Sequence, residues 1–513
     1  FSDTSGTSRY VYKLRQVKLG NATTNITDGK HILAGGNTTY VTTNAGGMYT
    51  FGQNSYGALF KGNTTMNYWA TKVQAEKNIL TMAITKNGAT GAIADIDGLV
   101  YTVGYNKNGE MGNGDTVNLS TLMCISQVKL IPTPLTINYA KAGDTGEQIT
   151  YTVTAGFNLL NDTVDQGTAT FTSLDKSVAT VDESGVVTAT GVGTTYIRLY
   201  NDSTDTYTAI KVNVTGDEGK TYPKIVAGSN HFAALRANGE IWTWGYNNYG
   251  QLGLGNEKTA TKPTQTSIYN VKDETQEVYA IDVAAGSYHT VVLKSDWTVW
   301  ASGYNKYGQL GDGSTNNSNV FVQVKNPNGD GYLQNVKAIA ANNCTSYALL
   351  EDGSVYAWGY NGNGNLGINT TDTVAHSLPN KMSKVTNIMQ ISAGNNHVVM
   401  LRADGTVWGV GYNEYGQLGL GNNTKNVTVA GQMKNSAGTG YLTGVKQVAC
   451  GSNHTLIALE SGSALGVGYN KNYQLGVGDR TNRNLPVTMT NTSSTAVTNI
   501  KSVSASGNSS ILS

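Results

Sequence analysis

The stretch from Gly245 to Gly255, GYNNYGQLGLG, decides the fold because near-copies of it recur along the whole chain. Seven copies are present, and six of them begin Gly-Tyr-Asn. Their leading glycines are Gly52, Gly104, Gly245, Gly303, Gly359, Gly411 and Gly468. Self-similarity at a regular period is the signature of a repeat architecture, in which each unit buries its apolar face against its neighbours. The chain of 513 residues is therefore predicted to be one array of seven units.

Each copy of this phrase lies in a longer unit that predicts four antiparallel strands. The five residues before the phrase, such as 240–244 (EIWTW), alternate and are rich in β-branched and aromatic residues, which favours a strand. A glycine six residues before the leading glycine, such as Gly239 or Gly353, suits a hairpin turn whose two central residues both have positive φ, although Trp297 takes its place in the fourth copy.

Further strands flank this hairpin. Head segments such as 226–235 (VAGSNHFAAL) predict two strands upstream, and a short polar strand follows the phrase. Helical periodicity of useful length is missing from the sequence. A four-stranded meander of this kind cannot bury its own apolar face, and radial stacking of such units is the propeller's solution.

One step between copies is too long for a single unit. Gly104 and Gly245 are 141 residues apart, whereas the other steps are 52 to 58 residues, so about 86 residues are extra. From about Leu130 to Gly216 the composition shifts to Thr, Val and Asp, with short alternating segments between Ser-Gly and Gly-x-Gly turns, which predicts a small β-sandwich. We expect a first propeller part over 1–129, an inserted domain over 130–218 and a second propeller part over 219–513.

Two family resemblances follow from these motifs. The AGxxHT.AL, DGxVyxWG and GxNxxGQLGxG segments resemble the regulator of chromosome condensation family of β-propellers over about 400 residues, which implies seven blades. Residues 173–197 (SLDKSVATVDESGVVTATGVGTTYI) resemble a bacterial immunoglobulin-like domain of group 2. The expected fold is all-β, a seven-bladed β-propeller with an inserted immunoglobulin-like β-sandwich.

The two ends of the sequence resemble parts of a unit. Residues 10–18 (YVYKLRQVK) are similar to a tail without a head, and residues 500–513 are similar to a head without its core. Either the two pieces pair and latch the ring, or the chain was cut from a longer repeat protein. The sequence leaves both interpretations open.

Composition excludes several classes of function. Charged residues make up only 13% of the chain and the net charge is +1, so a basic stripe for nucleic acid is missing. Apolar runs long enough to insert into a membrane are also missing from the sequence. The low charge, the few cysteines and a start at Phe1 favour a mature or excised segment of an exported bacterial protein.

Candidate catalytic and metal-binding residues have structural explanations. Four histidines share one slot of the repeat and are interpreted as structural, because recurring buried polar groups usually satisfy neighbouring polar atoms: His231, His289, His397 and His454. Asp95-Ile96-Asp97-Gly98 lacks the further oxygen ligands of a calcium loop. The three cysteines form no metal motif, and Cys344 and Cys450 are expected to be buried free thiols. We therefore expect no enzyme activity, no cofactor and no metal.

The candidate binding residues are tyrosines. Tyr56, Tyr249, Tyr307 and Tyr415 share one position, three residues before the Leu of the phrase, and should line one face of the ring. Tyrosine gives a large contact area at low entropic cost and is enriched at binding surfaces. The alternative interpretation is that these side chains pack blade against blade.

The sequence favours a non-enzymatic binding, adhesion or structural module of a bacterial surface or secreted protein, acting through a propeller face. Its partner would be a protein or glycan on a cell surface, and assembly with copies of itself or into a larger surface structure is compatible with this role. The alternatives are a bacteriophage head or tail decoration or receptor-binding protein, and a secreted protein-inhibiting propeller, since a secreted β-lactamase inhibitor shares the repeat family. A nucleotide-exchange factor like the family's founding member is the least favoured, because no exchange residues can be matched.

Overall fold

The structure is a computed structural model. It describes residues 26, 29–36, 38–43, 47–73, 79–85, 87–95, 99–129, 150–152, 169–176, 178–183, 186–190, 193–201, 206–214, 221–266, 268, 278–491 and 493–512. All regular secondary structure in these residues is β-strand. The tail-like segment 10–18 lies outside the described residues, as do Asp97 and Gly98.

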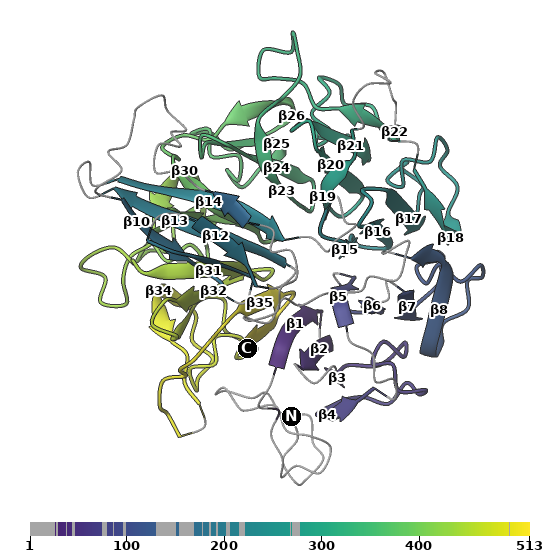
Figure 1. The fold of residues 1–513 in the computed structure, drawn as a ribbon, viewed down its shortest axis with the longest axis horizontal. Coiled ribbons are helices and arrows are strands. Elements are labelled where there is room, and N and C mark those ends of the chain that lie inside the picture. Colours follow the sequence, from purple (N-terminus) through teal and green to yellow (C-terminus); the bar gives the residue numbers. More distant parts are fainter. Residues whose placement is uncertain are drawn as a thin grey trace.

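The strands form seven four-stranded antiparallel sheets, which are the blades of a propeller (Figure 1). Blade one contains β1 (Gly29–Gly35), β2 (Thr38–Thr43), β3 (Met48–Gly52) and β4 (Asn67–Lys72), and blade two contains β5 (Ile79–Ile84), β6 (Thr90–Asp95), β7 (Leu99–Gly104) and β8 (Leu119–Lys129). Blade three contains β15 (Lys224–Ala227), β16 (His231–Leu235), β17 (Ile241–Gly245) and β18 (Ala260–Gln265), and blade four contains β19 (Ala280–Ala285), β20 (His289–Lys294), β21 (Val299–Gly303) and β22 (Ser318–Gln323). Blade five contains β23 (Val336–Asn342), β24 (Thr345–Leu350), β25 (Val355–Asn361) and β26 (Asp372–Lys381), blade six contains β27 (Ile388–Ala393), β28 (His397–Arg402), β29 (Val407–Tyr412) and β30 (Asn426–Gln432), and blade seven contains β31 (Val445–Cys450), β32 (His454–Leu459), β33 (Ala464–Gly468) and β34 (Arg483–Thr488).

A C-terminal hairpin lies between the seventh blade and the first. It consists of β35 (Val503–Ser506) and β36 (Ser509–Leu512), and β35 contacts both β31 and β1. The Ser509 hydroxyl donates to the carbonyl of Gly36 at 2.9 Å. The head-like segment that the sequence left without a partner therefore takes a place in the ring, beside blade one (Figure 1).

The first strands of successive blades pack side by side and face the ring axis, as the contacts of β5 with β1 and β15 show. Since successive strands run in opposite directions, the loops alternate between two ends of the ring. One end, here called the tyrosine face, carries the Gly-Tyr-Asn phrases and the loops between first and second strands. The opposite end, the turn face, carries the hairpin turns between second and third strands and the connections between blades.

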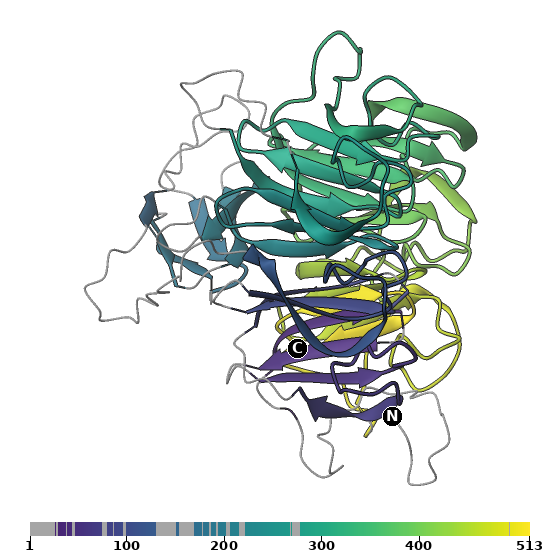
Figure 2. The same cartoon turned by 90° about the vertical axis from the view of Figure 1, so that its right-hand side faces the viewer.

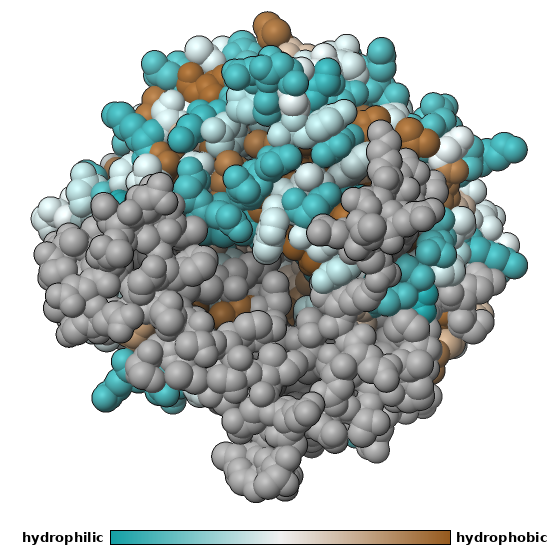
Figure 3. Space-filling view, turned by 45° about the horizontal axis from the view of Figure 1, so that its top comes forward, coloured by the Kyte–Doolittle hydropathy of each residue, from teal (hydrophilic) through white to brown (hydrophobic). Residues whose placement is uncertain are grey.

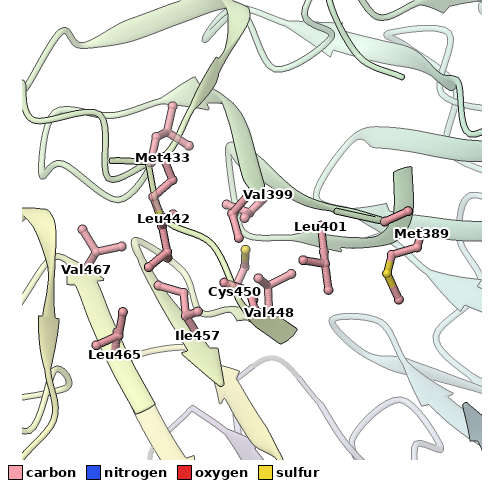
Figure 4. Close-up of a cluster of buried hydrophobic side chains, with 14 residues drawn as sticks. Met389, Val399, Leu401, Met433, Leu442, Val448, Cys450, Ile457, Leu465 and Val467 are labelled. Carbon is pink, nitrogen blue, oxygen red and sulfur yellow. The ribbon is translucent and has the colours of Figure 1, made fainter. Parts of the chain in front are cut away.

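The packing between blades is apolar. A representative cluster joins blades six and seven and contains Val399, Leu401, Val448, Ile457 and ten further buried residues (Figure 4). Similar clusters fill the neighbouring interfaces, for example around Leu310 and Trp358 between blades four and five. The predicted role of each unit, burial of one meander against the next, is confirmed by these clusters.

The hairpin turns differ from the prediction in one respect. Gly239, Gly353 and Gly405 have φ of +82°, +75° and +77°, but Asn238, Asp352 and Asp404 before them do not have positive φ. In blade three the Arg236 amide donates to the Glu240 carbonyl and the Gly239 amide donates to the Arg236 carbonyl. This is a three-residue turn with a single left-handed glycine, so the expected pair of positive φ values was wrong.

Trp297 occupies this left-handed position in blade four, with φ of +62° and 42% of its surface exposed. A left-handed conformation is unfavourable for a residue with a Cβ, and we expect Trp297→Gly to raise the free energy of unfolding by about 0.5–1 kcal/mol after the entropic cost of glycine is deducted. Urea unfolding checks this value.

The matched control is Gly353→Ala in blade five. Gly353 has φ of +75°, and an added Cβ would lie 2.6 Å from Asn387 Cα, so this change should destabilise the protein. Destabilisation by Trp297→Gly would show instead that the indole is a packing residue.

Residues between blades two and three form two further sheets outside the ring. One contains β10 (Ala169–Ser173), β13 (Gly193–Asn201) and β14 (Thr206–Val214), and the other contains β9 (Thr150–Thr152), β11 (Ala179–Val181) and β12 (Val186–Ala189). We call these strands the insert. Figure 2 shows the insert on one side of the ring, against the turn face. On the described surface in Figure 3, hydrophobic residues are scattered among hydrophilic ones.

Candidate functional site

The loops of the tyrosine face owe their shape to three residues of the repeated phrase. Gly245 has φ of +102°, and a Cβ there would lie 2.6 Å from the Asn230 carbonyl oxygen, so glycine is required. The buried Asn247 amide donates to the carbonyls of Asn256 and Lys258 at 2.8 and 3.0 Å, while its oxygen accepts from the Leu252 amide at 2.9 Å. The buried Leu252 side chain then fixes the loop to the core.

This arrangement recurs in every blade. The equivalent asparagines accept from the backbone amide five residues later: Asn54, Asn106, Asn305, Asn361, Asn413 and Asn470. Seven similar rigid loops are therefore presented at one end of the ring, and their variable side chains distinguish them.

Tyrosines from three adjacent blades form a continuous row on this face. The Tyr249 ring of blade three lies 4.9 Å, centroid to centroid, from Tyr304 of blade four and 5.4 Å from Tyr288 of the same blade. The Tyr307 ring of blade four lies 5.0 Å from Tyr360 of blade five. We call this row the tyrosine arc; its members, all half-buried, are Tyr246, Tyr249, Tyr288, Tyr304, Tyr307 and Tyr360.

The other two predicted binding residues lie in separate groups. Tyr415 contacts Tyr412 of its own blade and Tyr469 of blade seven, at 5.8 and 4.9 Å. Tyr56, 44% exposed, contacts Tyr105 of blade two at 5.1 Å. Blade five carries Asn363 where its neighbours carry the loop tyrosine, which removes the ring that would bridge the arc to the Tyr415 group.

The structure shows features of both interpretations of the loop tyrosines. Each one touches the tyrosine that follows the leading glycine of the next blade, so it links neighbouring blades. Each also keeps part of its ring at the surface. Partial burial and the neighbouring phenols raise the pKa of Tyr246 and Tyr304, so both remain neutral hydrogen-bonding groups at physiological pH.

Tyr288 was missed by the sequence analysis. It occupies the position before the shared slot of the histidines, where blades two, three, five, six and seven carry Ala89, Asn230, Cys344, Asn396 and Asn453. Its ring contacts Tyr246 and Tyr249, and so joins the phrase loop of blade three to blade four. A comparison of the head segments for aromatic exceptions could have found it.

The four repeated histidines join each blade to the next one below the tyrosine face. His231 Nε2 lies 3.0 Å from Thr290 Oγ1, and that hydroxyl donates to the Gln251 carbonyl at 2.7 Å. Because the hydroxyl proton is used, Nε2 is the donor to the threonine. His289, His397 and His454 reach Ser346, Thr455 and Ser510 of the following element in the same way.

All four imidazoles are buried. Burial lowers the pKa of His397 to about 3 and that of His454 to about 4. Neutral rings that cross-link blades act as structural residues, and a proton shuttle would need a pKa near the working pH. The structural interpretation of the histidines is supported by this geometry.

The thiols and possible metal ligands give no further site. Cys124, Cys344 and Cys450 form no disulfide; Cys450 is buried as expected, whereas Cys344 is only half-buried, because it sits in the surface loop position of Tyr288. Within the described part of the chain, no cluster of three or more His, Cys, Asp or Glu side chains could hold a metal ion. The described residues also contain no helix long and apolar enough to cross a membrane.

Family models match the second part of the propeller. The RCC1-like domain matches residues 273–512, and the regulator of chromosome condensation (RCC1) repeat matches residues 238–293 and, in a second version, 224–251. The ultraviolet-B receptor UVR8 of Arabidopsis thaliana is 29% identical over 294 residues, which is 56% of this chain and 61% of that protein. The X-linked retinitis pigmentosa GTPase regulator of Homo sapiens is 31% identical over 320 residues, 52% of this chain and 30% of that protein.

Solved structures match over more of the chain but at low identity. Human WBSCR16 is 16% identical with a TM-score of 0.57, covering 90% of this chain and 96% of that one. Prp20p from Saccharomyces cerevisiae is 18% identical with a TM-score of 0.57, covering 90% and 89%. The chain spans less than two thirds of the length of UVR8 and of the retinitis pigmentosa GTPase regulator. Their activities therefore do not transfer directly to this chain. Residues 224–512 are therefore built of RCC1-like repeats, in a chain that folds as a seven-bladed β-propeller.

Proposed function

We propose that this protein is a non-enzymatic scaffold that binds another protein through its tyrosine face. The tyrosine arc is the single observation that carries the proposal, because six half-buried aromatic rings from three blades form one row on rigid loops. Hot spots of protein interfaces are enriched in tyrosine, and a rigid aromatic surface loses little entropy on binding. No cofactor is required for this role.

The relatives support protein binding as the class of function. A solved structure of Prp20p is titled for its binding properties to Gsp1p and histones, and one relative is named a GTPase regulator. Propellers carry many unrelated sites, so these partners are not assigned to this chain. Nucleotide exchange on a GTPase is the second candidate function, favoured by the RCC1-like repeats and by the relative named a GTPase regulator, and a nucleotide-release assay would test it.

We further propose that the setting is the surface of a bacterium or its surroundings. Residues 173–197 of the insert resemble a bacterial immunoglobulin-like domain of group 2, and 13% charged residues fit an exported surface. Under this proposal the insert is an immunoglobulin-like sandwich, and the partner is a surface protein or its glycans. A virion decoration and a secreted enzyme inhibitor remain the alternatives, and inhibition of a purified β-lactamase tests the latter.

Tyr249→Ala and Tyr307→Ala are expected to weaken binding by about thirtyfold or more each, the usual effect of truncating an interface anchor. The measurement is saturation binding of fluorescently labelled protein to intact bacterial and animal cells, before and after trypsin treatment of the cells. A protein partner predicts saturable binding that trypsin removes, and a glycan partner predicts binding that survives.

The matched controls are Tyr332→Ala and Tyr441→Ala. Both side chains are more than half exposed, at 53% and 58%, and lie in connections between blades on the turn face. They should leave binding unchanged. Because Tyr249 also packs between blades, the melting temperature of the Tyr249→Ala variant must be measured alongside its binding. Equal losses of binding affinity for both pairs of variants would refute the tyrosine face as the binding surface. So would a loss of affinity that only follows the loss of thermal stability.

A further inference from the structure

The insert lies against the turn face, and its contacts reach a blade far from its own attachment. It joins the ring between β8 of blade two and β15 of blade three. Yet the Arg198 guanidinium on β13 forms an ion pair with Glu460 of blade seven and donates to the Val445 carbonyl of that blade at 3.2 Å. The described part of the insert therefore rests on a blade that is not a neighbour, along the chain, of the two blades between which it is attached.

Other contacts of the insert agree with this position. Leu174 and Tyr196 pack against the apolar cluster between blades six and seven that includes Met389 and Val448. Strand β14 contacts β27, the inner strand of blade six. Figure 1 shows β13 and β14 lying over the strands of blades six and seven.

Arg198 is the polar centre of this interface. Its side chain is only 9% exposed, whereas Glu460 is 40% exposed and remains on the ring whether or not the insert is docked. A buried guanidinium that loses its partner is strongly unfavourable, because its charge is then neither paired nor hydrated. The apolar contacts of Leu174 and Tyr196 supply the attraction, and the Arg198 pair fixes one orientation.

We infer that the insert is a docked bar, fixed by Arg198 against the turn face over blades six and seven, and not a tethered spacer. It covers the turn face over blades six and seven, which leaves the tyrosine face as the more accessible end of the ring for a partner. The docking itself does not depend on the proposed function. Only its consequence for the direction of binding rests on that proposal.

The test measures how readily the interface opens in the full chain. Leu174→Cys places a thiol against the ring in a background in which the exposed Cys124 and the half-buried Cys344 are both replaced by serine. The rate of its reaction with a bulky maleimide then reports the open population. We expect Arg198→Glu and, separately, Glu460→Arg to raise this rate about tenfold to a hundredfold, less than a fully buried pair would give because Glu460 is half-exposed.

The double swap Arg198→Glu with Glu460→Arg should recover most of the slow labelling. The matched control, Arg236→Glu, breaks the Arg236–Glu240 ion pair within blade three and should leave labelling unchanged. Glu460→Arg also guards against misfolding of the insert, since it changes only the ring. Fast labelling in the protein that keeps the Arg198–Glu460 pair, or the same labelling rate in all variants, would contradict the proposal that the insert is docked on the ring. Cell binding that survives Arg198→Glu but not Tyr249→Ala would keep the two proposals distinct.

Discussion

Trp358→Ala is expected to lower the free energy of unfolding by about 3–5 kcal/mol, the usual cost of emptying a buried tryptophan site. Trp358 is fully buried in the cluster between blades four and five. Its Nε1–H donates across that interface to the Gln309 carbonyl at 2.9 Å. The residue therefore joins two blades by both its apolar area and its one polar atom. Chemical denaturation of the full chain measures the loss.

Two variants separate the contributions to this loss. Trp358→Phe keeps most of the ring and should cost only about 1 kcal/mol for the hydrogen bond, because the Gln309 carbonyl still accepts from the Ser346 hydroxyl. Trp300→Ala removes a half-buried indole of blade four and should cost clearly less than Trp358→Ala. Equal losses of unfolding free energy in the two alanine variants would contradict the assignment of Trp358 as a packing residue between blades four and five.

Acid should destabilise the ring well above the pH at which carboxylates titrate. His397 and His454 have pKa values of about 3 and about 4 in the folded protein, against an ordinary value of 6.5. Because the folded-state pKa is lower, these histidines are protonated in the unfolded chain but stay neutral in the folded chain at pH values between the two pKa values. Stability is therefore complete above pH 6.5 and falls as the pH drops towards 4, by about 3 kcal/mol for each of these two histidines.

Urea unfolding between pH 7 and pH 4 checks this expectation. His397→Gln and His454→Gln should each be less stable at pH 7, because the inter-blade contact changes, but should lose less stability on acidification. Asp372 and Asp479 have lowered pKa values from hydrogen bonds to His376 and Arg483, opposed by partial burial, and they lose their contribution only at lower pH. A parent protein whose stability is flat from pH 6.5 to pH 4 would show that the histidines are hydrated.

Much of the fold could be predicted because the repeat encodes it locally. Gly245, Asn247 and Leu252 each act within one loop, so seven copies of the phrase predict seven equivalent loops and blades. The turns were mispredicted because Asn-Gly and Asp-Gly pairs are compatible with two turn types, and the extra residue that selects the three-residue form depends on strand register.

The candidate site could be predicted only in part. The position of Tyr249 and Tyr307 follows from the phrase, but their continuity through Tyr304 and Tyr288 depends on which ring the next blade presents. Arg198 had no recognisable role in the sequence, since its partners Glu460 and Val445 are more than two hundred residues away. These contacts arise from docking of the insert on a distant blade, which no local sequence pattern predicts.

The central claim, that partners bind at the tyrosine face, is tested most directly by site-specific photo-crosslinking. A photoreactive side chain at the exposed Asn248, between Tyr246 and Tyr249, is compared with one at Tyr332 on the turn face, each on cells that bind the parent protein. The account predicts a covalent adduct from position 248 that disappears with Tyr249→Ala, and none from position 332. Adducts from position 332 alone, or equally from both positions, would contradict it.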